Sequence, residues 1–287
     1  MTWIISGFAD EAGPTTREQI DALTRDGLTH IDLRAVEGAN ITALDPAVAR
    51  TVRQQLDEAG IAVNMFGSPI GKIDIADDIA SDVERLRHLG EMARIFDCKA
   101  VRIFSYYNKA GQPHDRWQAA SIDRLKTLRD EADKLDLVLY HENESDIFGD
   151  RSDDVLALAP LRDGERFKLI YDFANYIRTG ERGLDTWAKF RDKTDALHFK
   201  DQKKNGEHVP IGQGDTDAAA ILEDAAAMGW TGPCTLEPHL VHSAAVLATG
   251  ASGTGSQSLK DLGPAECFHV AAAEARRLLD RIGVAYR

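Results

Sequence analysis

The sequence predicts an α/β fold, a (β/α)8 TIM barrel, and three observations predict it. Eight short apolar segments rich in β-forming residues recur along the 287 residues. Amphipathic helical stretches lie between them, and several of these end in Gly, as a helix C-cap does, just before the next strand. No G-x-G-x-x-G or Walker-type loop follows any strand, which argues against an open nucleotide-binding sheet. Eight alternating units favour a closed barrel.

The predicted strands follow one another from the start of the chain almost to its end. They cover residues 2–8, 29–34, 61–67, 100–107, 137–143, 167–175, 196–201 and 233–239. Helices are expected between them, for example over 15–27, 47–60 and 217–229, and a closing helix is expected near 265–283. Because strands and helices alternate, the strands are predicted to be parallel, with right-handed crossovers.

The chain is predicted to be one domain, 1–287, because no linker divides it. The segment 241–264, which follows the eighth strand, is irregular and rich in Gly, Ser and Ala. A long loop at that place lies over the carboxyl end of the barrel, so we expect either a lid or an ordinary surface loop.

Composition and charge exclude several classes of protein. The formal net charge of −13 argues against a nucleic-acid partner, which needs Lys and Arg to neutralise phosphates. Three isolated cysteines without a CxxC pair suggest neither a disulfide framework nor a zinc ribbon. The N-terminal "MTWIISGFADEAG" lacks the basic region of a signal peptide, and no apolar run reaches the length of a membrane span. We therefore expect a cytoplasmic protein with no membrane partner.

Four consecutive predicted strands end in residues that can bind a metal or move a proton. Glu142 ends the fifth strand, Asp172 lies in the sixth, His198 in the seventh and Glu237 in the eighth. Taken singly, each is explained as a turn, a cap or a satisfied polar residue. Together they would meet at the carboxyl end of a barrel, where converging carboxylates need a compensating cation. Oxygen-rich coordination favours Mn²⁺, with Mg²⁺, Co²⁺ or Zn²⁺ as alternatives.

An ordered set of short motifs carries a family resemblance over nearly the whole chain. The motifs are "GFADE" (7–11), "GSPIGKI" (67–73), "VRIFSYY" (101–107), "HENESDIFGD" (141–150), "YDFANY" (171–176), "HFKD" (198–201), "GQGDTD" (212–217) and "LEPHL" (236–240). With them the chain resembles the xylose isomerase-like TIM barrels, the superfamily of sugar phosphate isomerases and epimerases related to AP endonuclease family 2. The resemblance implies fold and metal site but does not choose a substrate.

The family pattern, carried over position by position, implies four metal ligands. They are the Glu before Asn on the fifth strand (Glu142), the Asp of D-x-x-N (Asp172), the His of H-x-K-D (His198) and the Glu of the eighth strand (Glu237). In the ketose epimerases of the superfamily, the two metal-bound glutamates also act as the acid/base pair. The resemblance therefore implies that Glu142 and Glu237 are catalytic.

The chemistry of this site allows more than one reaction. We expect an isomerase or epimerase that acts on a keto-sugar or sugar derivative, a small-molecule carbohydrate, through an enediolate. The alternative is a lyase, an inosose or keto-sugar dehydratase, that uses the same metal. A DNA-repair endonuclease like endonuclease IV is disfavoured, because its extra histidines are missing from the second and third strands. A non-catalytic sugar-binding barrel is also disfavoured, because all four ligands are present.

Basic residues at the ends of four strands are candidates for binding a phosphate or carboxylate of the substrate. They are Arg34, Lys72, Arg102 and Lys200. The alternative is that Arg34 and Lys200 form structural salt bridges with acids such as Asp10, Glu11, Asp32 or Asp201.

The remaining polar residues near the ligands receive distinct expectations. His239 shares a strand face with Glu237, so it is expected to contact substrate or to orient a ligand. Glu144 is expected to be an outer, substrate-binding group, and Asn143 to fix the turn or a substrate hydroxyl. His141 alternates away from Glu142 and is not expected to be a ligand. Barrels of this superfamily are often dimers or tetramers, so a homo-oligomer is expected.

Overall fold

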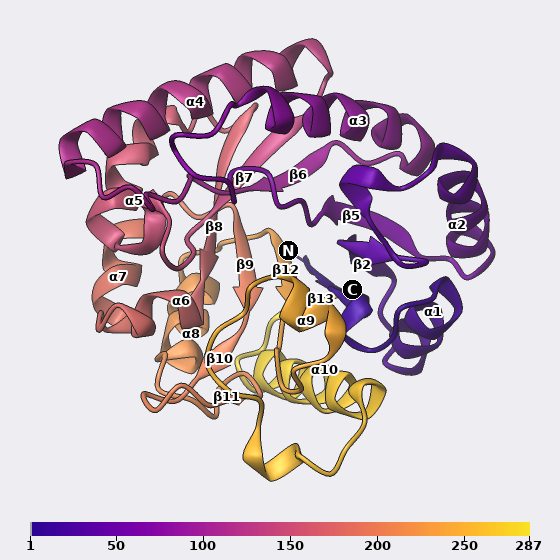
Figure 1. Ribbon diagram of the computed structural model, residues 1–287. Helices are drawn as coiled ribbons and strands as arrows, with labels where there is room; N and C mark the ends of the chain where they lie inside the picture. The colour runs from indigo at the N-terminus through magenta and orange to yellow at the C-terminus, as the bar shows by residue number, and fades with distance from the viewer. Residues whose placement is uncertain (1) are drawn as a thin grey trace.

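Eight parallel strands form the centre of the computed structural model, which describes residues 2–287, and helices surround them (Figure 1). The strands are β1 (Thr2–Gly7), β2 (His30–Leu33), β5 (Ala62–Phe66), β6 (Ala100–Ile103), β7 (Val138–Glu142), β8 (Phe167–Asp172), β9 (Ala196–Phe199) and β12 (Pro233–Leu236). Each lies within a segment predicted as a strand. The predicted α/β fold, a (β/α)8 TIM barrel, is confirmed.

The hydrogen-bonded ladders run in the order β13-β1-β12-β9-β8-β7-β6-β5-β2, where β13 (Ala285–Tyr286) is a short C-terminal strand beside β1. The two ends of this order, β1 and β2, contact each other at the seam. Near this seam, Asn64 donates from Nδ2 to Asp32 Oδ1 (2.7 Å) and to Ser6 Oγ (3.3 Å). Polar side chains inside the barrel therefore tie β5 to β2 and β1.

The helices around the barrel bury apolar faces against the strands. They are α1 (Thr16–Arg25), α2 (Pro46–Glu58), α3 (Ala80–Phe96), α4 (His114–Lys134), α5 (Ser152–Leu158), α6 (Phe173–Arg178), α7 (Gly183–Phe190), α8 (Ala218–Ala227) and α10 (Pro264–Arg281). Local sequence fixes their starts: α1 has a capping box between Thr15 and Glu18, and Asp45 caps α2 with Pro46 at its first position.

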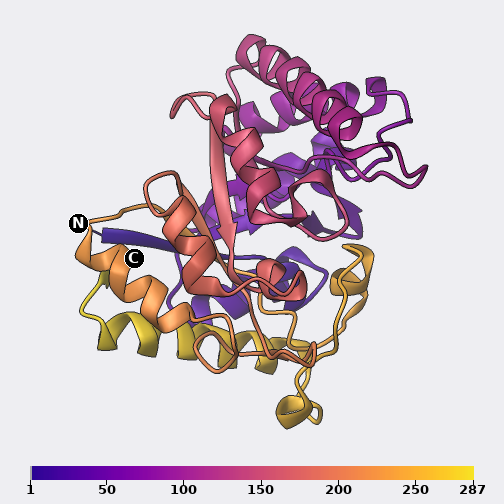
Figure 2. The ribbon, with the colours of Figure 1, turned by 90° about the vertical axis from the view of Figure 1, so that its left-hand side faces the viewer.

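Smaller elements gather at the carboxyl ends of the strands. Two hairpins lie there, β3 (Ala35–Val36) with β4 (Ala39–Asn40), and β10 (Asp201–Gln202) with β11 (His208–Val209). Short helices lie in these loops: η1 (Ala9–Glu11), η2 (Ile41–Ala43), η3 (Phe148–Asp150), η5 (Gln257–Leu259) and α9 (Ala244–Ala248). The short helix η4 (Ala159–Leu161) lies instead between α5 and the start of β8. Figure 2 shows α9 on the side of the barrel opposite the N-terminus.

The segment predicted as a lid or surface loop, 241–264, contains α9 and η5 and is tied to both sides of the carboxyl face. His208 Nε2 lies 3.0 Å from the Ser252 carbonyl, and the Thr254 N–H donates to the Gly206 carbonyl (2.9 Å). On the other side, Lys72 Nζ donates to the Thr249 carbonyl (3.0 Å). The segment spans the barrel mouth, and its movement as a lid stays a prediction.

Every strand ends one to four residues earlier than predicted, and the fourth, sixth and eighth differ most. The eighth stops at Leu236, so Glu237 and His239 follow the strand and do not share one of its faces. The sixth stops at Asp172, and α6 begins at Phe173, because the Asp172 carboxylate caps the helix by accepting from the Asn175 N–H (2.9 Å). The fourth stops at Ile103, and residues 104–107 form a loop in which Tyr106 has φ +73°.

The three cysteines are free and buried, as their isolated positions predict. Among residues 2–287, no helix has the length and apolar character needed to cross a membrane.

Candidate metal centre

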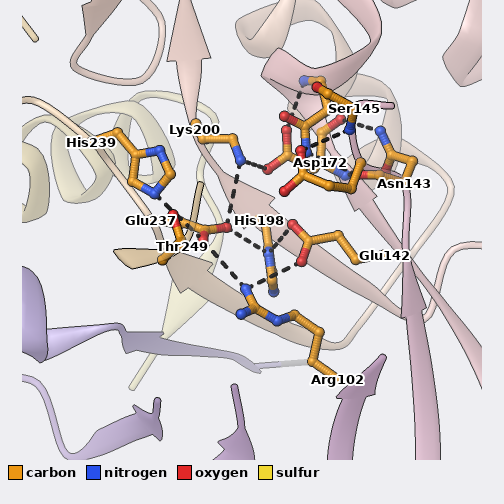
Figure 3. A network of polar contacts seen from close by, with 12 residues as sticks. Arg102, Glu142, Asn143, Ser145, Asp172, His198, Lys200, Glu237, His239 and Thr249 are labelled. Carbon is orange, nitrogen blue, oxygen red and sulfur yellow. Dashed lines mark hydrogen bonds and ion pairs between the residues drawn. The ribbon is translucent and has the colours of Figure 1, made fainter. Parts of the chain in front are cut away.

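Glu142, Asp172, His198 and Glu237 converge at the carboxyl end of the barrel (Figure 3). Their strands are neighbours, β7, β8, β9 and β12, and the register pairs Asp172 with His198 and Thr235 with His198. One ligand atom from each of the four lies within 4.8 Å of the others, and all four residues are buried. Their convergence follows from the barrel, which brings the ends of neighbouring parallel strands to one rim.

His198 lies between the two glutamates. Its Nδ1 is 2.8 Å from Glu142 Oε1 and 3.1 Å from Glu237 Oε2. Burial alone would lower the pKa of His198, but the two carboxylates outweigh it and raise the pKa to about 10. In the absence of another cation, the imidazole therefore supplies a positive charge between the carboxylates.

Two basic side chains also face these carboxylates. Arg102 Nη1 is 3.2 Å from Glu142 Oε2 and 3.3 Å from Glu237 Oε1, and Lys200 Nζ is 2.9 Å from Asp172 Oδ2. Burial alone would lower the pKa of Lys200, but Asp172 and the neighbouring glutamates raise it above its usual value. Arg102 and Lys200 thus partly neutralise the cluster.

The cluster fits a divalent cation. Glu142 Oε2 and Asp172 Oδ2 are fully buried acceptors without a hydrogen-bond partner, because their contacts to Arg102 and Lys200 are ion pairs that lack hydrogen-bond geometry. Burial and the negative charges of both glutamates raise the pKa of Asp172, although Lys200 opposes them. Unpartnered buried carboxylate oxygens are costly, and three carboxylates with one imidazole suit Mn²⁺, Mg²⁺ or Zn²⁺.

A second group of side chains surrounds the other side of Glu237. Glu11 Oε2 accepts a hydrogen bond from the backbone N–H of His239 (2.9 Å), a residue with φ +48° that follows the eighth strand. The His239 Nε2 atom is buried without a hydrogen-bond partner and lies 3.6 Å from Glu237 Oε1. Glu11 therefore holds the turn that positions both Glu237 and His239.

Arg34 binds the acids of this second group. It donates to Asp10 from Nε (2.8 Å) and from Nη2 (3.0 Å), and Nη1 donates to Glu237 Oε1 (3.2 Å). Its Nη2 also lies 3.4 Å from Glu11 Oε1. Arg34 thus forms the structural salt bridges that were the alternative to substrate binding, and its partners include Asp10 and Glu11. Lys200 instead pairs with Asp172.

Lys72 and Glu144, two expected substrate-binding residues, bind each other. Lys72 Nζ donates to Glu144 Oε2 (2.9 Å) in a largely buried pair. Burial alone would raise the pKa of Glu144, but Lys72 and Lys200 hold it well below its usual range. The pair lies at the edge of the site, beneath the Thr249 carbonyl.

Asn143 fixes the turn beside the ligands. It donates to the Asp172 carbonyl (3.1 Å) and accepts from the Asp172 N–H (2.8 Å), so it ties the end of β7 to the end of β8. His141 lies apart from the cluster and has Nε2 2.9 Å from Ser105 Oγ.

Sequence reasoning missed the contributions of Phe8 and Glu11 to the site. The Phe8 ring lies edge-on to His198, with ring centres 5.6 Å apart, and contacts the guanidinium groups of Arg34 and Arg102. The signal lies in "GFADE", at the end of the first strand, where the sequence indicates salt-bridge partners for the two acids but no role for the ring.

Comparisons with known proteins agree with this fold. The family model described as "xylose isomerase-like TIM barrel" matches residues 20–261. No curated protein sequence matches the chain.

Many solved structures are similar in fold, at low sequence identity. L-ribulose 3-epimerase has a TM-score of 0.74 and 16% identity, over 98% of this chain and 96% of its own. The IOLI protein with a binding zinc atom has a TM-score of 0.74 and 12% identity, over 98% and 99%. The probable 3-DHS dehydratase AsbF from Bacillus anthracis has a TM-score of 0.67 and 15% identity, over 87% and 97%.

Proposed function

The chain belongs to the xylose isomerase-like TIM barrel family, and we propose that it is a divalent-metal-dependent isomerase or epimerase of a keto-sugar or sugar derivative. One observation carries the proposal: Glu142 and Glu237, two buried carboxylates, flank His198 and share a metal-binding group with Asp172. Two carboxylates beside one candidate cation site support a reaction in which one group removes a proton and the other returns one.

Glu142, Asp172, His198 and Glu237 would hold the ion. A divalent ion bound there would polarise a ketone and a neighbouring hydroxyl of the substrate. It would thereby acidify the C–H bond of the carbon that bears this hydroxyl. One of the two glutamates removes this proton and leaves an enediolate. If the other glutamate returns a proton from the opposite face, the centre is inverted, and if a proton reaches the neighbouring carbon, the sugar is isomerised.

The donor set also bears on the choice of ion. Three carboxylates and one imidazole support Mn²⁺ or Mg²⁺. The similar structure described with a zinc atom supports Zn²⁺ as the alternative.

A lyase is the second candidate, and the similar fold of a probable dehydratase favours it. Loss of a hydroxyl next to the enediolate would give dehydration from the same site. Solvent-deuterium exchange distinguishes the two reactions, because an epimerase or isomerase carries solvent hydrogen into recovered sugar, whereas a dehydratase releases water and an unsaturated ketone.

The test is a panel of ketoses, keto-sugar acids and inososes, incubated in D₂O with Mn²⁺-loaded protein and followed by NMR. We expect deuterium at one sugar carbon with wild type and none with Glu142→Gln or Glu237→Gln. Glu131→Gln, a change on the outer helix α4, is the matched control and should exchange normally. Near-wild-type exchange by either site variant would refute the acid/base assignment, and elimination without exchange would favour the lyase.

A further inference from the structure

A chamber of about 750 Å³ lies beside the candidate metal centre, at the carboxyl end of the barrel. The β3–β4 hairpin forms one wall and α9 forms another. Residues of η1, α3 and β6, together with loop residues after β2, β5 and β6, also belong to the lining. This chamber is much larger than the space that a single sugar ring fills. It has room for a substituent beyond the sugar.

The chamber and the metal centre share two side chains. Arg34 and Arg102 line the chamber, and the same guanidinium groups lie 3.2 Å and 3.3 Å from Glu237 Oε1. A sugar whose reacting carbons lie at Glu237 would therefore have its far end in the chamber.

Small apolar residues make up much of the hairpin wall and of the α9 wall. They are Ala35, Val36 and Ala39 of the hairpin, and Ala244, Ala245 and Ala248 of α9. Phe104 adds an aromatic ring to the lining, with Lys72 Nζ 4.4 Å from the ring centre. Such a surface gains free energy when it buries hydrocarbon or an aromatic ring.

Three of the four cations of the lining are neutralised by acids outside the candidate metal-binding group. The pairs are Arg34–Asp10 (2.8 Å), Lys72–Glu144 (2.9 Å) and Arg85–Asp82 (2.8 Å). The fourth cation, Arg102, pairs with Glu142 (3.2 Å), which a bound ion would share. A phosphate group would bring two negative charges next to these carboxylates and would have to displace them. These pairs therefore disfavour a sugar phosphate as the substrate. The sequence alone suggested one, because basic residues end four of the predicted strands.

We propose that the substrate is an unphosphorylated glycoside-type keto-sugar whose apolar or aromatic aglycone occupies this chamber. That the substrate is a keto-sugar rests on the proposed function. That an apolar aglycone occupies the chamber rests only on the volume, the lining residues and the charge pairing of the chamber.

The test measures binding rather than turnover, by calorimetry on Mn²⁺-loaded protein. The probes are methyl and phenyl glycosides of glucose, galactose, mannose and xylose, together with glucose 6-phosphate. For at least one sugar, we expect the phenyl glycoside to bind roughly tenfold or more tightly than its methyl counterpart, because burying much of a phenyl ring is worth about one order of magnitude in affinity. Glucose 6-phosphate should bind no more tightly than methyl glucoside.

Two variants on α9 locate the effect. Ala245→Trp fills the chamber and should reduce the phenyl preference to about twofold or less. Leu247→Trp places the same side chain on the same helix, but at an exposed position outside the lining, and should keep the preference. Thermal unfolding of each variant checks that it is folded.

Equal affinity for phenyl and methyl glycosides in every sugar, or tightest binding of glucose 6-phosphate, would overturn the inference on wild-type protein alone. A phenyl preference that survives Ala245→Trp would also overturn it. Failure of deuterium exchange with an intact phenyl preference would count against the proposed function and not against the chamber.

Discussion

Replacement of Arg102 by Met tests whether the carboxylates of the metal centre depend on positive charge. The guanidinium lies 3.2 Å from Glu142 and 3.3 Å from Glu237, and all three side chains are at most 5% exposed. Removing one partner of such a buried pair costs about 3–5 kcal/mol, because the remaining charges are left uncompensated. Arg34 and His198 still face Glu237, so we expect the lower end, about 3 kcal/mol, in metal-free protein.

A bound divalent cation should remove most of this cost, since it would compensate the same two carboxylates. With saturating Mn²⁺ we expect the loss to shrink to about 1 kcal/mol, the contribution of the contacts between the guanidinium and the rings of Phe8 and Phe104. The assay is urea unfolding of wild type and Arg102→Met, each with EDTA and with Mn²⁺.

The matched control is Arg85→Met. Arg85 is paired with Asp82 (2.8 Å), neither residue belongs to the metal cluster, and its replacement should have the same effect with and without metal. An Arg102→Met protein that loses equal stability in EDTA and in Mn²⁺ would refute the account, because guanidinium and metal would then not share the two carboxylates.

Three further predictions follow from the site and its surroundings. Glu142→Gln and Glu237→Gln should abolish turnover yet keep some metal, which steady-state assays with elemental analysis can check. His198→Ala should lower the metal content to well below that of wild type in the same analysis. Burial lowers the pKa of His208 to about 4, so the unfolded chain takes up a proton below pH 6.5 while the folded chain does not. His208 alone should therefore cost about 1.6 kcal/mol of stability between pH 6.5 and 5, and His208→Gln should reduce the total loss by about this amount in urea unfolding.

The strands of the barrel could be predicted because each is a short apolar run that stays within one element. Their ends were less predictable. "FKLIYDFAN" reads as one strand, but the Asp172 side chain caps a helix at the same point where it meets His198. The sequence around Asp172 does not distinguish a strand residue that faces the candidate metal centre from a residue that caps a helix. The end of the strand could therefore not be predicted.

The convergence of Glu142, Asp172, His198 and Glu237 could also be predicted, because the fold places the ends of successive strands at one rim. For Arg34, the sequence suggested Asp10 and Glu11 as partners, but it did not suggest Glu237. Arg34 lies 203 residues from Glu237, and only the closed ring brings β2 and β12 to the same side of the site. The sequence shows a basic residue at a strand end, whereas the identity of its partner depends on which acids share its side of the barrel.

Anomalous diffraction from crystals grown with Mn²⁺ would show directly whether the four converging side chains bind the ion. We expect one strong anomalous peak per chain, about 2.0–2.6 Å from oxygens of Glu142, Asp172 and Glu237 and from a nitrogen of His198. No peak at this position, or a strong peak elsewhere with the three carboxylates still paired to Arg102 and Lys200, would contradict the proposed metal centre.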